Sequence, residues 1–346
     1  MRLSIVIPMY NVENYISKTL YSLINQTEKL FEIILVDDGS TDNTCNVAES
    51  ILIKSNHENY NIIRQKNSGV SVARNRGLVE ATGEYVMFLD GDDYVSTELV
   101  NTIYDNIKKQ ISDIYCWGYN FVKEDQTVLL DYFDKYDSNL KKMTGAEALN
   151  NIIINKSMNI CTGSAAFKVE YLIENNNYYT EDCINGEDME FIYKALSKAD
   201  EVIFIAAILF NYLLRNDSIS NTYNINRFDA INAMLRTSRY MECTNAVELK
   251  LISEKITNEK IIEHYLYNFN SCFKNLYFNN KYSVREATKE IYHFIDIKFP
   301  NINNMIGIKM KQYRGGNINF LLSIKMFLIS PVLYCWVIKI KSKYNM

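Results

Sequence analysis

The stretch MFLDGDDY, residues 87–94, decides how the first part of the chain is interpreted. An apolar run, Val86–Leu89, leads into three carboxylates, Asp90, Asp92 and Asp93. The run is typical of a buried strand. Like charges this close disfavour each other's ionised forms unless a cation or hydrogen-bond donors compensate them. The stretch therefore predicts a strand whose carboxyl end holds a charged site.

Short apolar runs and segments with helical spacing alternate through the first 110 residues. The predicted strands are residues 3–8, 31–38, 60–65 and 84–90, and the predicted helices are 12–26, 42–54, 70–81 and 96–109. Strands that are apolar on both faces and alternate with helices predict an α/β fold with a mostly parallel sheet sandwiched by helices. Polar clusters follow each strand, at the edge where such sheets bind ligands.

The remaining chain is less regular up to residue 215 and helical beyond it. We predict strands at 113–122 and 126–133, a helix at 144–154 and a pair of strands within 201–215. From residue 224 the spacing predicts a helical C-terminal region. The expected domains are a ligand-binding α/β domain over 1–219, a helical region over 220–315 and a basic, apolar tail over 316–346.

The composition is that of a globular protein, with 48% hydrophobic and 23% charged residues. The seven cysteines are odd in number and contain no CxxC pair, which predicts free thiols in a reducing compartment. The first residues run directly into a strand-like segment, so a secretory signal is not expected.

Charge is unevenly distributed along the chain. All 41 acidic residues lie in residues 1–296, whereas residues 297–346 contain eight Lys and Arg and no acid. Within this basic end, Phe320–Ile338 is apolar and near the length of about 20 residues that spans a bilayer, but Lys325 and Pro331 interrupt it. We expect an element that lies at an anionic membrane surface. A pair of core helices is the alternative.

The acidic stretch suits a hard divalent cation that keeps waters and shares its ligands with a phosphate. In an extended chain Asp90 and Asp92 point to the same side, and Gly91 lets a ligand approach closely. Only three histidines are present, none in a paired motif, which disfavours zinc. An acidic turn that caps the next helix is the alternative.

A second acidic junction, VDDGSTDNT, occupies residues 36–44. We expect Thr41 or Asp42 to cap the following helix. This leaves Asp38 free to accept hydrogen bonds, for example from a nucleotide base or a ribose hydroxyl.

Two arginines follow in NSGVSVARNRG, residues 67–77. Arg74 and Arg76 lie near a predicted helix N-terminus, where a cation is unfavourable unless it faces an anion. A nucleotide diphosphate would supply that anion. The alternative is an ion pair with Asp37 or Asp90, which we favour for Arg76.

A later acidic pair, Glu187-Asp188, begins a predicted helix after Gly186. The helix dipole favours an ionised carboxylate at this end, and an ionised carboxylate can act as a general base. Ordinary enrichment of acids in a first helical turn is the alternative.

Four motifs in order, VIPMYN, VDDGSTDNT, NSGVSVARNRGL and YVMFLDGDDY, resemble the family 2 glycosyltransferases with the GT-A (Rossmann-like) fold, of the bacterial capsule and lipopolysaccharide type. The resemblance is close through about residue 120 and looser to about residue 220. It implies a nucleotide-sugar donor, usually UDP-linked, and a divalent cation, Mn²⁺ or Mg²⁺. It makes residues 1–219 the catalytic domain.

The resemblance also implies residue roles. The nucleotide falls to Pro8, Tyr10 and Asp38, the ribose to Asp90 and the metal to Asp92. Asp188 is the implied catalytic base. A basic residue beside the diphosphate is implied in NYLLRNDSIS, which offers Arg215 with Ser218 and Ser220. The Q-x-x-R-W element of processive synthases is absent, so processive synthesis is not implied.

The sequence therefore predicts an inverting glycosyltransferase that moves a sugar from a UDP-sugar to a saccharide acceptor, lipid-linked, in surface polysaccharide synthesis. We expect a cytoplasmic protein at the inner face of the cell membrane, with no nucleic-acid partner. A non-catalytic nucleotide-binding or membrane-associated scaffold is the alternative. Dinucleotide oxidoreduction is disfavoured because neither GxGxxG nor GxxxxGK[ST] occurs.

Overall fold

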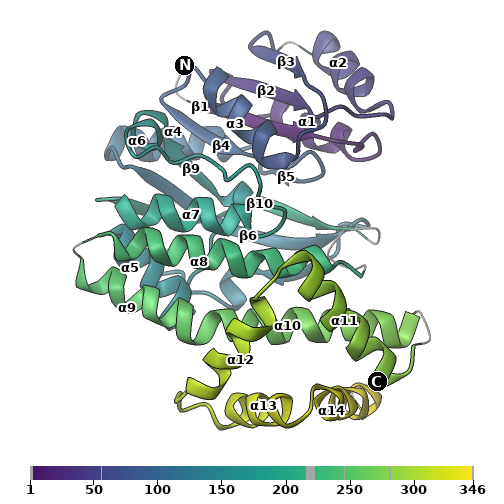
Figure 1. The fold of residues 1–346 in the computed structure, drawn as a ribbon. Coiled ribbons are helices and arrows are strands. Elements are labelled where there is room, and N and C mark those ends of the chain that lie inside the picture. The colour runs from purple at the N-terminus through teal and green to yellow at the C-terminus, as the bar shows by residue number, and fades with distance from the viewer. Residues whose placement is uncertain (1–2, 56, 216–222, 245, 280–281, 345–346) are drawn as a thin grey trace. The chain divides into compact units, whose positions relative to one another are not determined.

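The computed structural model describes residues 3–55, 57–215, 223–244, 246–279 and 282–344 (Figure 1). The chain divides into two compact units. Unit 1 comprises Met1–Asp182 and Glu187–Arg215, and unit 2 comprises Cys183–Gly186 and Asn216–Met346. The predicted domain boundary at residue 219 lies outside the described residues.

Unit 1 is built on a ten-stranded sheet with the order β3-β2-β1-β4-β9-β6-β10-β5, in which β7 pairs with β6 and β8 with β10. The strands are β1 (Leu3–Met9), β2 (Phe31–Asp37), β3 (Tyr60–Arg64), β4 (Tyr85–Phe88), β5 (Tyr94–Val95), β6 (Ile114–Lys123), β7 (Val128–Asp131), β8 (Lys142–Met143), β9 (Ala165–Lys168) and β10 (Val202–Leu214). The long pairs are parallel, namely β1 with β2, β1 with β4, β2 with β3 and β6 with β10. The short strands join in antiparallel pairs.

The first four predicted strands and helices are confirmed. The helices are α1 (Ile16–Ile24), α2 (Thr44–Lys54), α3 (Val70–Glu80) and α4 (Leu99–Lys109). Every residue of β1 is buried, as expected for a central strand covered on both faces, and α3 packs on β1 and β2. Unit 1 therefore has the predicted α/β fold, and the carboxyl ends of β1, β2 and β4 meet at one edge.

The strand pair predicted within 201–215 is wrong, because these residues form the single strand β10. Its pairing with β6 shifts register between Ile205 and Ile208 and again before Phe210, and then continues to Leu214. The segment contains no Gly, Pro, Asn or Asp before Asn211 that would favour a turn. The chain therefore absorbs the irregularity as bulges and carries Arg215 to the end of a long strand.

The middle of unit 1 follows the prediction more loosely. The predicted helix 144–154 is α5 (Gly145–Asn150), which continues as a wider turn to Asn155. A capping box between Thr144 and Glu147 begins it. Two further helices, α6 (Val169–Glu174) and α7 (Glu187–Lys198), complete the unit. In α7 one apolar face is buried, with Ile192 and Leu196 at its centre.

Unit 2 is helical, as predicted. Its described helices are α8 (Asp229–Glu242), α9 (Val247–Lys255), α10 (Ile261–Lys274), α11 (Val284–Lys298), α12 (Ile302–Gln312), α13 (Ile318–Ile329) and α14 (Pro331–Tyr344). Aromatic rings form part of its core. The Phe327 ring of α13 lies 5.0 Å from the Phe269 ring and 5.7 Å from the Tyr265 ring, both on α10.

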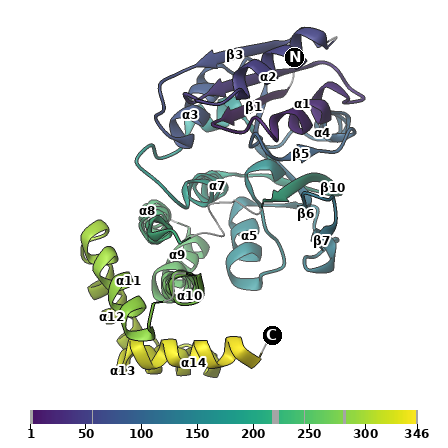
Figure 2. The ribbon, with the colours of Figure 1, turned by 90° about the vertical axis from the view of Figure 1, so that its right-hand side faces the viewer.

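The apolar segment 320–338 forms two helices, because Ser330-Pro331 separates α13 from α14. Proline cannot donate the backbone hydrogen bond that a continuous helix needs. The two helices pack side by side, and Figure 2 shows them lengthwise. Within the described residues, no helix combines the length and the apolar character that crossing a bilayer requires.

Candidate active site

The loops that follow β1 and β2 are tied together by hydrogen bonds. Asn11, in a left-handed conformation with φ 51°, accepts a hydrogen bond from Thr41 N at 2.8 Å. The backbone N–H of Val12 donates to Thr44 Oγ1 at 2.7 Å. Pro8 is buried beside β2, whereas Tyr10 is 49% exposed. This places a rigid backbone and one free-standing aromatic ring at the edge of the sheet.

Asp38 is buried and holds the loop before α3. Its carboxylate accepts hydrogen bonds from Ser68 N at 2.8 Å, Gly69 N at 2.9 Å and the Gln65 side chain at 2.8 Å. A carboxylate offers about four acceptor positions, so Asp38 has capacity for one further donor. The sequence did not reveal this structural role.

The third acid of the stretch 87–94, Asp93, is structural. It is 3% exposed, and its Oδ1 accepts a hydrogen bond from Leu213 N on β10 at 2.8 Å. Burial, and then the nearby charges of Asp92 and Asp90, raise the pKa of Asp93 well above its ordinary value. Asp93 thus fixes the acidic loop to β10. The other two acids, Asp90 and Asp92, face arginine side chains.

Asp90 is held by Arg74, which also contacts helix α7. Arg74 is 3% exposed; its Nη2 lies 2.8 Å from Asp90 Oδ1, and its Nη1 lies 3.2 Å from Glu187 Oε1 on α7. Burial would lower the pKa of Arg74, but Coulomb attraction to Asp90, Tyr179 and Glu187 raises it above its ordinary value. The arginine is therefore a permanent cation between two carboxylates.

Asp92 pairs with Arg215, whose Nη1 lies 3.2 Å from Asp92 Oδ2. The Arg215 guanidinium also stacks over the Tyr15 ring at 4.9 Å, a favourable cation–π distance. Ser218 and Ser220, predicted to accompany Arg215, lie outside the described residues. The structure thus places the predicted metal ligand and the predicted diphosphate-binding residue in contact.

Asp188 follows Glu187 in the first turn of α7, and Glu187 contacts the same arginine as Asp90. Burial, followed by the charges of Asp93, Asp90, Asp92 and Asp188, raises the pKa of Tyr212 above its ordinary value. Asp188 is far from Asp90, Asp92 and Asp93 in sequence. The first turn of α7 therefore joins the edge formed by the parallel strands.

Other side chains differ from the sequence prediction or had no sequence signal. Arg76 pairs with Glu80 on its own helix, at 3.0 Å, so the predicted pairing with Asp37 or Asp90 is wrong; residues four apart on a helix are neighbours. Tyr179 packs under Arg74, with the ring centroid 5.0 Å from the guanidinium. No motif marked it.

The carboxylates fit a cation that is shared with a substrate. An added Cβ at Gly91 would meet Pro8 O at 3.3 Å, so glycine lets the acidic loop approach β1. Among the described residues no three His, Cys, Asp or Glu side chains form a metal site of their own. Mg²⁺ is commonly bound through one or two carboxylates and completed by water and substrate phosphates, so Asp92 would be enough to hold such a cation together with a substrate phosphate.

Comparisons with known proteins agree with this arrangement. Residues 4–174 match the model of glycosyl transferase family 2. Glycosyltransferase GlyA of Streptococcus pneumoniae is 30% identical over 64% of this chain and 32% of its own length. The cholesterol galactosyltransferase of Borreliella burgdorferi is 30% identical over 65% of this chain and 63% of its own length.

The alignments therefore span less than two thirds of either relative. A solved structure, S. aureus TarS 1–349 in complex with UDP-GlcNAc, superposes with a TM-score of 0.65 at 21% identity, over 94% of this chain and 90% of that one. At this identity the likeness concerns the fold. With the ordered motifs, the sheet and the carboxylate edge, these matches show that residues 4–174 form a glycosyl transferase family 2 domain with the GT-A fold.

Proposed function

We propose that the protein is an inverting glycosyltransferase that moves a sugar from a UDP-sugar to a hydroxyl of a saccharide acceptor in surface polysaccharide synthesis. The family supports glycosyl transfer, and a structural neighbour that was solved with UDP-GlcNAc supports a UDP-sugar donor. Pro8, Tyr10 and Asp38 line the edge that would receive the nucleotide, and Asp90 would bind its ribose.

The observation that carries the proposal is the Arg74 bridge between Asp90 and Glu187. It joins the acidic loop of the donor side to the first turn of α7, where Asp188 stands next to Glu187. A donor and an acceptor must be held in one geometry for in-line attack. A screen of nucleotide sugars for slow hydrolysis by the purified protein tests the proposal and identifies the donor.

In the proposed reaction, the carboxylate of Asp188 takes the proton from the acceptor hydroxyl as the oxygen attacks the anomeric carbon. The bond from that carbon to the diphosphate breaks on the opposite side, so the configuration inverts. Arg215 stands beside Asp92 and would bind the diphosphate oxygens, where negative charge grows. A divalent cation, Mn²⁺ or Mg²⁺, on Asp92 would stabilise the same charge.

The rival function is a non-catalytic nucleotide-binding scaffold on the same fold. The pairing of Asp90 with Arg74 and of Asp92 with Arg215 favours it, because both acids have partners within the protein. Calorimetry with UDP, with and without Mn²⁺, distinguishes the two. Binding that depends on the metal, together with donor hydrolysis, supports the enzyme, whereas metal-independent binding without hydrolysis supports the scaffold.

Asp92→Asn is expected to abolish metal-dependent donor binding and leave the fold intact, because it removes a ligand charge and little volume. The gain in UDP affinity that Mn²⁺ provides should fall by about tenfold or more, since even residues behind a metal ligand cost this much when they are changed. Calorimetry measures it. Asp105→Asn, at an exposed position on α4, is the control. Unchanged affinity for UDP with Mn²⁺ in Asp92→Asn would show that the metal assignment is wrong.

We further propose that the acceptor is lipid-linked and that unit 2 lies on the cytoplasmic face of the cell membrane. The exposed positions of α13 are Ile318, Asn319, Leu322, Lys325, Leu328 and Ile329. Four of them, 318, 322, 325 and 329, recur at helical spacing and form one stripe. Leu333, Trp336 and Ile340 form a similar exposed stripe on α14. One relative is named a cholesterol galactosyltransferase, and this name supports a lipid as the kind of acceptor.

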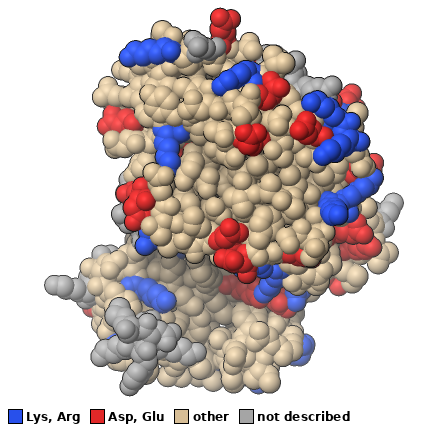
Figure 3. All heavy atoms as spheres, turned by 180° about the vertical axis from the view of Figure 1, so that it is seen from behind, with Lys and Arg blue, Asp and Glu red and all other residues tan. Residues whose placement is uncertain are grey.

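Charge supports the same surface. Residues 297–346 contain no acid, and Lys339 lies over the Trp336 ring at 4.4 Å. Trp and Lys together are typical of the boundary between lipid and water. By contrast, acidic and basic side chains are interspersed on the face of unit 1 drawn in Figure 3. The apolar stripes with basic neighbours therefore favour an anionic bilayer.

A double change, Ile318→Glu with Ile329→Glu, is expected to weaken binding to anionic vesicles by at least about tenfold. Each exposed isoleucine that enters lipid contributes about 1.5–3 kcal/mol, and the added acids are repelled by the lipid headgroups. Vesicle flotation at low and high salt measures the effect. Val247→Glu, at an exposed position on α9, should float like the parent. Full flotation of the double variant would place the membrane surface elsewhere.

A further inference from the structure

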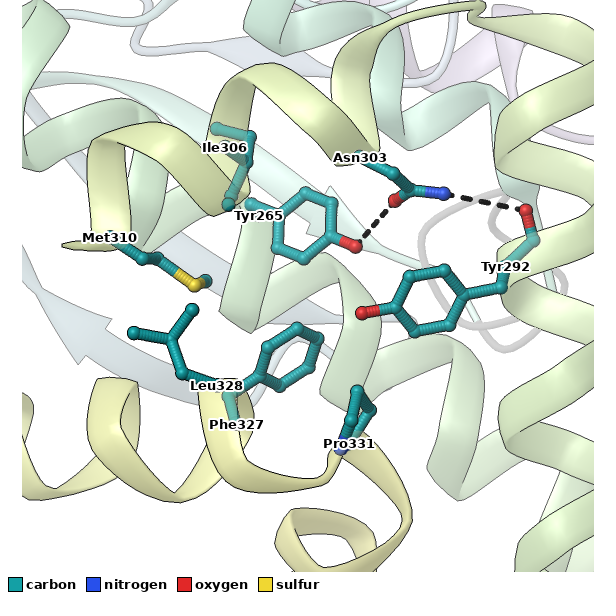
Figure 4. Close-up of a pocket in the computed structure, with 9 residues that line it drawn as sticks. Tyr265, Tyr292, Asn303, Ile306, Met310, Phe327, Leu328 and Pro331 are labelled. Carbon is teal, nitrogen blue, oxygen red and sulfur yellow. Dashed lines mark hydrogen bonds between the residues drawn. The ribbon is translucent and has the colours of Figure 1, made fainter.

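Unit 2 contains a partly open cavity of about 250 Å³ that has no part in the proposed reaction (Figure 4). Four helices and the start of α14 contribute to its wall. Tyr265 comes from α10, Tyr292 from α11, Ile306 and Met310 from α12, and Phe327 from α13. Their rings and apolar side chains point toward the same space (Figure 4).

Two polar side chains of the wall, Tyr265 and Asn303, are paired with protein atoms. The Tyr265 hydroxyl donates to Asn303 Oδ1 at 2.6 Å. The Asn303 amide donates to Asp296 Oδ1 at 2.8 Å and to the backbone oxygen of Tyr292 at 3.5 Å. Because these groups have partners, they need no water from the cavity. The rest of the wall consists mainly of aliphatic and aromatic side chains, which suit an apolar occupant.

One side of the cavity borders the apolar surface of α13. Leu328 lines the cavity and is also 37% exposed, and the next residue, Ile329, is 76% exposed. A single side chain therefore separates the cavity from the exposed stripe. Lys325 lies about one helical turn before Leu328 and is exposed. Lys325 thus places a basic group beside the exposed apolar side chains that border the cavity.

We propose that this cavity binds the end of one acyl chain of an anionic bilayer phospholipid, while the basic residues after residue 297 attract its phosphate. The inference rests on the proposed membrane contact and adds a specific lipid site to it. A cavity of about 150 Å³ can hold benzene, so by proportion about 250 Å³ has room for about ten carbon atoms. A chain end is the part of a phospholipid that fits both this size and the apolar wall.

Gly307 offers a direct way to fill the cavity. It lines the space on α12, and an added Cβ would meet no atom within 4 Å. Replacing a helical glycine also raises the helix propensity of this position. Gly307→Phe should therefore fold and occupy the cavity. Ile308→Phe is the matched control, because Ile308 is adjacent, 48% exposed and absent from the cavity wall.

The experiment uses phosphatidylglycerol with a photoreactive diazirine at the end of one acyl chain. The full-length protein is irradiated with vesicles that contain this lipid, and separately with a short-chain form kept below its micelle concentration. Labelled peptides are located by mass spectrometry. We expect label on α12 in both conditions, and Gly307→Phe should reduce it by about tenfold or more because the ring excludes the chain. Ile308→Phe should be labelled like the parent.

Two results would overturn the inference. One is equal labelling of α12 in Gly307→Phe and Ile308→Phe when circular dichroism shows both variants folded. The other is label restricted to α13 and α14 in the parent, which is contact with a membrane surface alone. Flotation is scored separately. If the protein does not float but the short-chain lipid labels α12, the membrane proposal fails while the lipid site stands.

Discussion

Asp188→Asn is expected to lower sugar transfer by about 10²- to 10⁴-fold, the range for loss of a general base, with donor binding nearly unchanged. The asparagine amide has almost the same volume but cannot accept the acceptor's proton. The base acts on the acceptor hydroxyl, so the donor should still bind. Transfer is measured with the donor found in the hydrolysis screen, and UDP affinity by calorimetry.

The control is Asp182→Asn, which changes an exposed acid a few residues earlier in the chain and should transfer at the parental rate. Parental transfer by Asp188→Asn would remove Asp188 from the mechanism. A large loss of UDP affinity in Asp188→Asn would assign the residue to the donor site instead. The two measurements together therefore identify which substrate Asp188 serves.

The strands and helices of residues 3–109 could be predicted because each local signal agreed with the fold. Strands such as β1 are mostly apolar and buried throughout, and the helices α1 and α4 have a clear apolar period. Consistency between local preference and the final fold makes such elements readable from sequence. The acidic stretch after β4 was readable for a different reason, since three close carboxylates need a compensating partner.

The sequence offered an arginine of residues 67–77 as one possible partner of Asp90, but it did not indicate the other partners. Asp90 is compensated by Arg74, 16 residues earlier, and the same arginine reaches Glu187, 113 residues further along the chain. Asp93 is compensated by the backbone of Leu213, 120 residues away. Such pairings depend on the order of strands in the sheet. The sequence identified residues that require partners, and only the fold determines which partners they meet.

In the C-terminal segment, the length of an apolar run does not give the length of a helix. Residues 320–338 have the composition of a membrane segment, yet one proline divides them into two short helices. Phe327 and Cys335 are buried while Ile329 and Trp336 are exposed. The helix pair α13 and α14 therefore has apolar side chains both toward the core of unit 2 and toward the outside. Composition counts all the apolar residues of the segment together and does not distinguish those that are buried from those that are exposed.

Arg74→Met is expected to destabilise the folded protein by about 3–5 kcal/mol, because breaking a buried ion pair on one side leaves uncompensated buried charge. Asp90 and Glu187 both lose their cation, and Met keeps most of the side-chain length. Chemical denaturation of parent and variant measures the change. Arg76→Met is the matched control on the same helix. Its pair with Glu80 is 54% and 35% exposed, so it should cost less than about 1 kcal/mol.

The destabilisation by Arg74→Met should also depend on pH. Burial, and then the charge of Asp188, raise the pKa of Glu187 above its ordinary value, while Arg74 opposes the rise. Without Arg74 the folded-state pKa of Glu187 rises further. A carboxyl group with a raised pKa in the folded state favours folding once it is protonated, so the variant should recover stability as the pH falls from about 7 toward 5. A loss of stability that is equal at both pH values would show that Arg74 stabilises the protein through packing, with no charge bridge between Asp90 and Glu187.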